Sequence, residues 1–261
     1  MESVAQTASF SQAGDQGGVL AFLYLYNALQ MSAVLQPGDR VLDLACGPAN
    51  QLVQVARLNP GVRFVGLDAS PTMLQCAQST LAQAGVSNVE LVQGDMSRLT
   101  NLEDASLDGV ICTMSLHHLP DQAALCATLL EVRRVLKPQG RFYLMDFGRL
   151  KRLSTQRFLA DDLRQSAQFT EDYFNSLRAA FSVEELTAAV APLGPDVQRH
   201  VTVLAPFMVV FRSALQRPMD LPTLQRAKEA FANLSPAQQT NFRSVANWFR
   251  GSGYALPCAL D

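Results

Sequence analysis

The sequence predicts an α/β protein in which a mostly parallel sheet is covered by helices on both faces. From Arg40 to Gly148, short apolar runs alternate with longer segments that have the periodicity of helices. Runs that are apolar throughout indicate strands buried on both faces, and helices that cross over between them make neighbouring strands parallel. The expected strands are 41–45, 62–67, 89–92, 107–112 and 141–145, and the expected helices lie near 50–59, 71–84 and 121–136.

Turn residues support these boundaries and indicate a change after residue 150. Ser70-Pro71 predicts a helix start, because serine caps the first turn and proline is favoured within it. Lys137-Pro138-Gln139-Gly140 is expected to end a helix and to turn into the next strand. A helical stretch at about 154–191 precedes two apolar runs, 197–204 and 207–211. Only Ala205-Pro206 joins them, so they are expected to form an antiparallel hairpin.

The pattern divides the chain into three parts. Residues 1–37 form a polar leader and an apolar cap helix, residues 38–215 form the main domain with a helical insert at about 150–192, and residues 216–261 form a helical extension. In the extension, aromatic residues recur at helical spacing. They are expected to cover either the domain's own apolar surface or a second copy of the chain, which leaves a homodimer open. These residues are Phe231, Phe242, Trp248 and Phe249.

Composition limits the partners that the chain can have. Its 261 residues carry a formal net charge of -2, so no basic surplus exists to neutralise a nucleic acid. The apolar stretch 19–35 is interrupted by polar residues and is too short to cross a membrane. The start Met1-Glu2-Ser3 lacks the cationic residues of a secretory signal, and the five cysteines contain no C-x-x-C pair. We therefore expect a cytoplasmic protein that binds neither nucleic acid nor membrane.

The strongest chemical signal follows the first expected strand. There a turn of small residues around Gly47 leads into a helix, so that a ligand can approach the backbone beside exposed N–H groups. Asp68 ends the second strand, where a carboxylate can accept hydrogen bonds from both hydroxyls of a ribose. Asp95 follows the third strand and is placed to receive an adenine amino group, with Met96 against the ring.

These residues resemble the class I S-adenosylmethionine-dependent methyltransferases. The glycine-rich motif of that family is an acid followed by three small residues at alternate positions, here Asp43, Ala45, Gly47 and Ala49. Only the central small residue is glycine, which is a departure from the motif. Leu136-Lys-Pro-Gln-Gly140 matches another hallmark of the family.

The resemblance covers about residues 38–213 and implies a Rossmann-like sheet of seven strands that ends in a hairpin. It also implies S-adenosylmethionine as the cofactor and S-adenosylhomocysteine as its product. By the resemblance, Asp43 faces the methionine amino group, Asp68 the ribose, and Asp95 with Met96 the adenine. Further expected cofactor contacts are Ala45, Gly47, Asn50, Ala69 and Thr113.

Two other functions remain open from the sequence. A dinucleotide-binding oxidoreductase usually has G-x-G-x-x-G, whereas this loop has Ala45, Gly47 and Asn50 at those positions. A protein that keeps the cofactor without transferring a methyl group is the other alternative, and His117 and Asp146 weigh against it.

Methyl transfer from a sulfonium needs an acceptor held in line, and a base can remove the acceptor's proton. Such a base is expected beyond the fourth and fifth strands, where sheets of this kind place their ligands. His117 and His118 follow the fourth strand, and Asp146 ends the fifth. This segment resembles the His-His-x-x-Asp segment of small-molecule methyltransferases. The resemblance implies His117 as the base and Asp146 as its orienting partner, although many members of the family work by proximity alone.

The alternative for either histidine is a capping or packing role, which we favour for His118. Adjacent histidines also occur as metal ligands, but the only other histidine is His200, so no metal is expected.

Three residues are candidates for contacting the acceptor: Tyr24, His118 and Arg149. Tyr24 lies on the cap helix, and Arg149 belongs to a basic segment that either grips an anionic acceptor or is simply solvated. The Asn/Asp-Pro-Pro-Tyr motif of amine-methylating relatives is absent after the fourth strand. We therefore expect methylation of a small molecule on oxygen, carbon or nitrogen, of the kind found in secondary metabolism.

Overall fold

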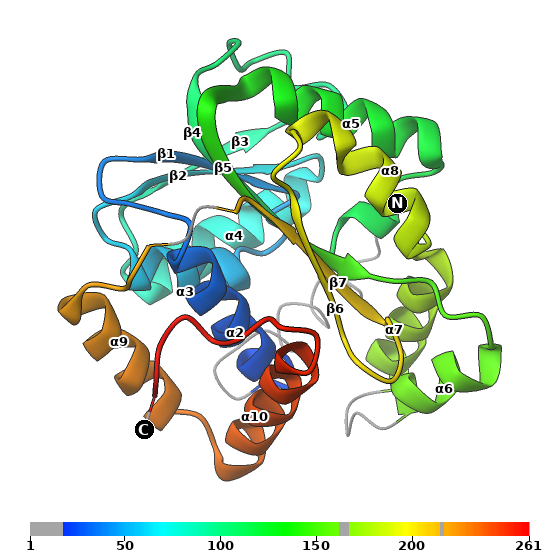
Figure 1. Ribbon diagram of the computed structural model, residues 1–261. Coiled ribbons are helices and arrows are strands. Elements are labelled where there is room, and N and C mark those ends of the chain that lie inside the picture. The colour runs from blue at the N-terminus through cyan, green and yellow to red at the C-terminus, as the bar shows by residue number, and fades with distance from the viewer. Residues whose placement is uncertain (1–17, 162–166, 215–216, 261) are drawn as a thin grey trace.

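The computed structural model describes residues 18–161, 167–214 and 217–260, which form a seven-stranded sheet between two layers of helices (Figure 1). The strand order is β3-β2-β1-β4-β5-β7-β6. Strands β1 to β5 are parallel, and β7 pairs antiparallel with both β5 and β6, which confirms the predicted sheet and its closing hairpin. The strands are β1 (Arg40–Leu44), β2 (Arg63–Asp68), β3 (Val89–Gln93), β4 (Leu107–Thr113), β5 (Leu136–Phe147), β6 (Gln198–Val201) and β7 (Met208–Arg212).

Alternate side chains of the central strands enter two separate cores. Val41, Ile111 and Tyr143 pack in one core with residues of α2, α3, α4, α9 and α10, whereas Leu42 and Val110 pack in the other with α5 and α8. The helices are α2 (Ala21–Ser32), α3 (Asn50–Leu58), α4 (Pro71–Ala84), η1 (Leu116–His118), α5 (Gln122–Val135), α6 (Leu153–Asp161), α7 (Ala167–Ala179), α8 (Val183–Val190), η2 (Ala191–Leu193), α9 (Leu221–Ala232) and α10 (Pro236–Arg250).

The α4 cap lies where the sequence predicts it, and α10 has a cap of its own. The Ser70 side chain accepts a hydrogen bond from the Met73 N–H, and Pro71 occupies the first turn of α4. At the start of α10, Ser235 and Gln238 form the reciprocal hydrogen bonds of a capping box. In the ranges that the structure describes, no helix is both long enough and apolar enough to cross a membrane.

Two segments differ in detail from the sequence prediction. The segment after α5 was expected to be a turn, but Leu136 already pairs with Leu107, and β5 then bulges before Arg141 pairs with Gly109. The first strand of the hairpin is shorter than predicted, and the connection has six residues, 202–207, instead of two. The Thr202 side chain closes this connection by donating to the Ala205 carbonyl over 2.7 Å. Leu204 has a φ of 71°, which is not a strand conformation, so the first strand cannot continue to residue 204.

The aromatic residues of the C-terminal extension cover the chain's own core. The Phe249 ring stacks on Tyr26 of α2 with centroids 5.6 Å apart, and Phe242 meets the same tyrosine edge-on at 6.0 Å. Figure 1 shows α10 beside α2, on the same side of the sheet as α9. Phe231 is buried with them, and Trp248 packs edge-on against Phe207. The extension therefore supports α2 from outside.

Two buried tyrosines near α2 have different surroundings. The Tyr143 hydroxyl donates to the Asn27 side-chain oxygen over 2.8 Å. Tyr254, from the segment after α10, stacks on the His200 ring with centroids 4.1 Å apart and lies under the Arg212 guanidinium. Its hydroxyl is buried and has no hydrogen-bond partner among the described residues.

These surroundings predict opposite effects for one chemical change. Tyr143→Phe should lower the free energy of unfolding by about 1–3 kcal/mol, because it leaves the Asn27 oxygen buried without a donor. Tyr254→Phe removes a hydroxyl that has no partner and should leave the stability unchanged or raise it by up to about 1 kcal/mol. Urea unfolding of both variants measures the difference. Equal losses would show that the Tyr254 hydroxyl does have a partner, such as a buried water.

Candidate functional site

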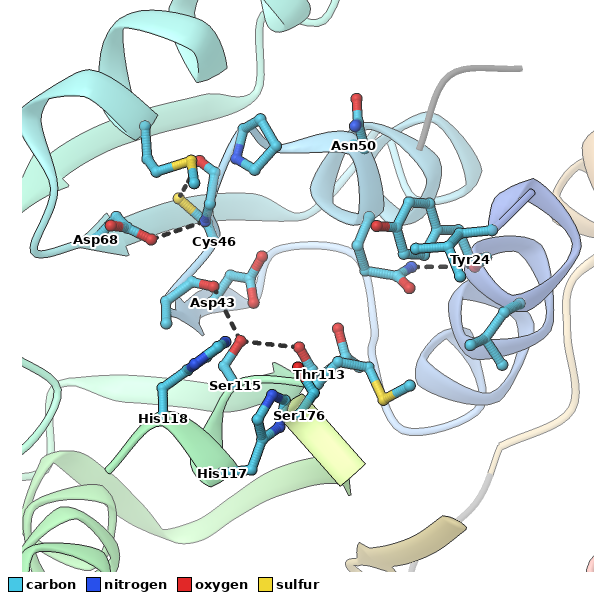
Figure 2. A pocket seen from close by; sticks show the side chains of 18 of the residues that line it. Tyr24, Asp43, Cys46, Asn50, Asp68, Thr113, Ser115, His117, His118 and Ser176 are labelled. Carbon is cyan, nitrogen blue, oxygen red and sulfur yellow. Dashed lines mark hydrogen bonds between the residues drawn. The ribbon is translucent and has the colours of Figure 1, made fainter. Parts of the chain in front are cut away.

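A pocket opens at the carboxyl ends of β1 and β4 (Figure 2). These two strands are neighbours in the sheet, but the chain leaves β1 for α3 in one helical layer and β4 for α5 in the other. The connections therefore diverge and leave a crevice between them, which is where open α/β sheets bind ligands. Helices α2 and α7 complete the walls.

Most of the predicted site residues meet at this pocket. The residues that line it include Tyr24, Asp43, Ala45, Gly47, Asn50, Asp68, Thr113, His117 and His118. Asp146 lies directly behind His117. Besides Asp146, four predicted residues do not line it: Ala69, Asp95, Met96 and Arg149.

Asp95 and Arg149 make contacts elsewhere. The exposed Asp95 carboxylate accepts hydrogen bonds from the N–H and the hydroxyl of Ser97. The Arg149 side chain donates to the Ala180 carbonyl over 2.8 Å and pairs with Glu185 at 3.1 Å. The guanidinium is therefore held by α8 and by the chain before it.

The loop between β1 and α3 has an unusual backbone. Ala45, Gly47 and Ala49 all have positive φ angles, of 55°, 54° and 65° respectively. This region favours glycine, because a side chain there crowds the backbone. The alternate small residues of the motif are therefore the three positions at which the turn is left-handed. A Cβ added to Gly47 would meet open space, so nothing but the pocket lies beside it.

Asp68 ties this loop to the end of β2. One of its carboxylate oxygens accepts a hydrogen bond from the Gly47 N–H over 2.8 Å, and the other accepts from the Ser70 N–H over 2.9 Å. The Cys46 N–H donates to the Leu67 carbonyl over 2.9 Å. These bonds fix the loop against β2 and hold the carboxylate at the pocket wall.

Asp43 is a buried acid with an uncommon electrostatic environment. Burial, together with the neighbouring charge of Asp68, raises the pKa of its carboxyl to about 8. A cationic group placed in the pocket would favour the ionised form and would reverse this shift.

The connection after β4 joins the two sides of the crevice. Met114 has a φ of 55°, a strained conformation for a bulky residue, and its N–H donates to the Met145 carbonyl. The Ser115 hydroxyl lies 2.9 Å from the Thr113 carbonyl and 3.3 Å from the Ala45 carbonyl. Strain of this kind is typical of functional sites.

His117 and Asp146 form a buried pair. The His117 Nδ1 lies 2.7 Å from one Asp146 oxygen, and the His117 backbone N–H donates to the other over 3.1 Å. Burial alone would raise the pKa of Asp146, but the attraction of the His117 ring and the hydrogen bonds from His117 and Phe147 hold it below its ordinary value. An ionised carboxylate only accepts hydrogen bonds, so Nδ1 carries the proton of this hydrogen bond, and Nε2 is the ring nitrogen that can exchange a proton with a ligand. That Nε2 is buried and has no partner among the described residues.

The sequence did not identify several residues of the pocket. Phe147, Phe169, Tyr173 and Ser176 line it beyond the histidines. Three of them lie on α7, which has no motif to connect it with the site. The only signal in the sequence was the pair of aromatic residues four positions apart, which puts both rings on one face of a helix.

Comparisons with known proteins agree with this geometry. The family described as a methyltransferase domain matches residues 35–189, more than half of the chain. An uncharacterized 37.1 kDa protein in transposon TN4556 of Streptomyces fradiae is 36% identical over 46% of this chain and 33% of its own. A demethylmenaquinone methyltransferase of Listeria monocytogenes is 34% identical over 43% of this chain and 46% of its own. The chain thus spans less than half the length of these relatives.

The fold is also that of a solved structure. A SAM-dependent methyltransferase from Aquifex aeolicus superposes with a TM-score of 0.55 over 74% of this chain and 90% of that one, at 19% identity. The family match therefore supports S-adenosylmethionine over the dinucleotide that the sequence left open.

The raised pKa of Asp43 predicts how stability depends on pH. Between pH 4 and pH 8, roughly, the unfolded chain has released this proton while the folded protein keeps it, so the free energy of unfolding falls as the pH rises. The fall is at most about 1.4 kcal/mol per pH unit. Asp43→Asn removes this titrating carboxyl group. The free energy of unfolding of the variant should therefore rise relative to that of the original protein as the pH increases from 5 to 8. Urea unfolding at both pH values tests this, and parallel pH profiles would contradict it.

Proposed function

The chain belongs to the S-adenosylmethionine-dependent methyltransferases, and on this premise we propose that it methylates a small molecule, with His117 as the general base. The single observation that carries the assignment of His117 is its unpartnered, buried Nε2 on the pocket wall, with the opposite ring nitrogen held by Asp146. The Listeria relative is named for a small-molecule acceptor, demethylmenaquinone, which also supports the proposal.

The residues of the pocket fit the cofactor. Asp43 offers a buried carboxylate to the ammonium group of its methionine part, and Asp68 offers a carboxylate to the ribose hydroxyls. The first turn of α3 has no side-chain cap among the described residues, so its N–H groups suit a carboxylate. The Gln51 side-chain oxygen is buried on the same wall without a described partner. When bound, S-adenosylmethionine supplies an electrophilic methyl group that already carries its leaving group.

Of the other predicted cofactor contacts, Asn50, Ala45 and Thr113 belong to this proposed set because they line the pocket. The Ala69, Asp95 and Met96 contacts with the cofactor remain predictions. Asp95 is exposed and Met96 partly so, at the end of β3.

His117 and Asp146 have separate roles in the proposed reaction. Asp146 holds the ring in one orientation and one tautomer, and stabilises the positive charge that the ring gains with a proton. His117 receives the acceptor's proton at Nε2. Asp146 touches no acceptor in this scheme and acts only as a positioning residue.

The proposal includes the division of the chain made from the sequence. Residues 38–215 act as the cofactor-binding domain, and α2 acts as the cap whose Tyr24 contacts the acceptor. The extension at 216–261 holds α2 in place through Phe242 and Phe249.

His117→Ala should lower methyl transfer at least about a hundredfold, because it removes the base. Affinity for S-adenosylhomocysteine should stay within about threefold of the original, since the change leaves Asp43 and Asp68 intact. Turnover is followed as S-adenosylhomocysteine formed with a metabolite pool as acceptor, and affinity is measured by calorimetry.

His200→Ala is the matched control, because His200 lies on β6 outside the pocket lining. It should change turnover less than threefold. If His117→Ala loses less than threefold in turnover, His117 is not the base, and the enzyme acts only by holding the two reactants together.

A further inference from the structure

The pocket wall beyond the histidines is made of aromatic rings. The Phe147 ring contacts the His117 ring, with centroids 5.2 Å apart. The Tyr173 ring meets Phe147 edge-on at 5.4 Å, and the Phe169 ring stacks on Tyr173 at 6.4 Å. All three of these residues, which we call the aromatic wall, line the pocket. Rings in such a series offer faces and edges to a flat ligand, and each good aromatic pair adds affinity beyond the burial of area.

The described lining of this pocket supplies no lysine or arginine to bind an anionic acceptor. None of the described residues that line it is lysine or arginine, whereas Asp43 and Asp68 are both acids. The nearby Arg149 pairs with Glu185, and Arg157 pairs with Glu171 while it lies over the Phe174 ring. An acceptor that carries a carboxylate or phosphate would lose its hydration here without a countercharge.

The base also selects the kind of hydroxyl. His117 Nε2 can take a proton only from a group that is acidic enough to release it as the oxygen reacts. A phenolic hydroxyl has a pKa of about 10, as in tyrosine, whereas an alkyl hydroxyl is nearer to water at about 15.7. The imidazole is therefore much better matched to a phenol.

Resting on the proposed function, we propose that the acceptor is an uncharged aromatic hydroxyl compound whose ring packs on the aromatic wall. Its hydroxyl then lies against His117 Nε2. In the reaction, the phenolic oxygen bonds to the donor's methyl carbon as the bond from that carbon to sulfur breaks. The electron pair of the broken bond remains on sulfur, and the hydroxyl proton moves to His117 Nε2, which gives a methyl aryl ether.

Three related probes test this acceptor class. They are β-naphthol, its carboxylate derivative and its saturated counterpart decahydro-β-naphthol. Each is titrated by calorimetry into the protein saturated with S-adenosylhomocysteine, and the methyl ether formed with S-adenosylmethionine is measured by mass spectrometry. β-Naphthol should bind at least tenfold more tightly than either other probe, and should be the only one methylated at a measurable rate.

Variants of α7 connect the preference with the aromatic wall. Phe169→Leu and Tyr173→Leu keep apolar volume but remove a ring, and each should weaken β-naphthol binding by about threefold to tenfold. Phe158→Leu is the matched control, because Phe158 is a phenylalanine on α6 that is 69% exposed. It should leave binding unchanged. Ser176→Lys adds a cation to the pocket wall and should raise affinity for the carboxylate probe at least fivefold.

The outcomes separate this inference from the proposed function. If S-adenosylhomocysteine binds but β-naphthol does not, or if the carboxylate or saturated probe binds equally well, the acceptor class is wrong and the proposed function stands. Unchanged β-naphthol affinity in both leucine variants would also overturn the inference. If S-adenosylhomocysteine itself does not bind, the proposed function fails and the inference fails with it.

Discussion

The site depends on the divergence of β1 and β4. These strands run parallel side by side, yet their connections enter opposite helical layers, so none of the described segments fills the space at their carboxyl ends. Everything else is anchored to that edge. Asp43 and Asp146 lie one residue before the ends of β1 and β5, and Asp68 ends β2 and holds the left-handed loop by the Gly47 N–H. The sheet thus brings together acids that are far apart in the sequence.

The two most deeply buried of these acids show how local donors decide the charge of a carboxyl group. Asp146 has His117 and the Phe147 N–H as partners, so its pKa falls and it remains ionised. Asp43 lies 3% exposed with another acid as its main electrostatic neighbour, so its pKa rises. Asp146 is therefore ionised beside His117, whereas Asp43 would be stabilised in its charged form only by a cation in the pocket. A single pocket can in this way hold two carboxyl groups with different functions.

Sequence reasoning recovered the half of the site that depends on the sheet. Strand ends are marked by apolar runs and by the small residues after them, so the positions of Asp43, Asp68 and His117 followed from the pattern. It could not recover features set by tertiary packing. Arg149 was expected either to grip an anionic acceptor or to be solvated, but it pairs with Glu185 on α8, and that contact spans two helices with no local signal. The hairpin loop and the bulge in β5 likewise depend on pairing partners that the sequence does not reveal.

Under the proposed function, the acceptor side of the pocket is formed by α2 and α7, which differ in their relation to the family match. The family match covers residues 35–189, so Tyr24 on α2 lies before it. Phe242 and Phe249, which pack against α2, lie after it. The wall from α7 lies within the match, but no motif fixes it. Since the cofactor half is set by strand ends and a strained loop, it tolerates little change. The acceptor half is set by side chains on helices that pack against the sheet, and a helix can exchange such side chains without disturbing the sheet. Under the proposed function, acceptor choice therefore depends on side chains of α2 and α7, which belong to no motif that identifies the family.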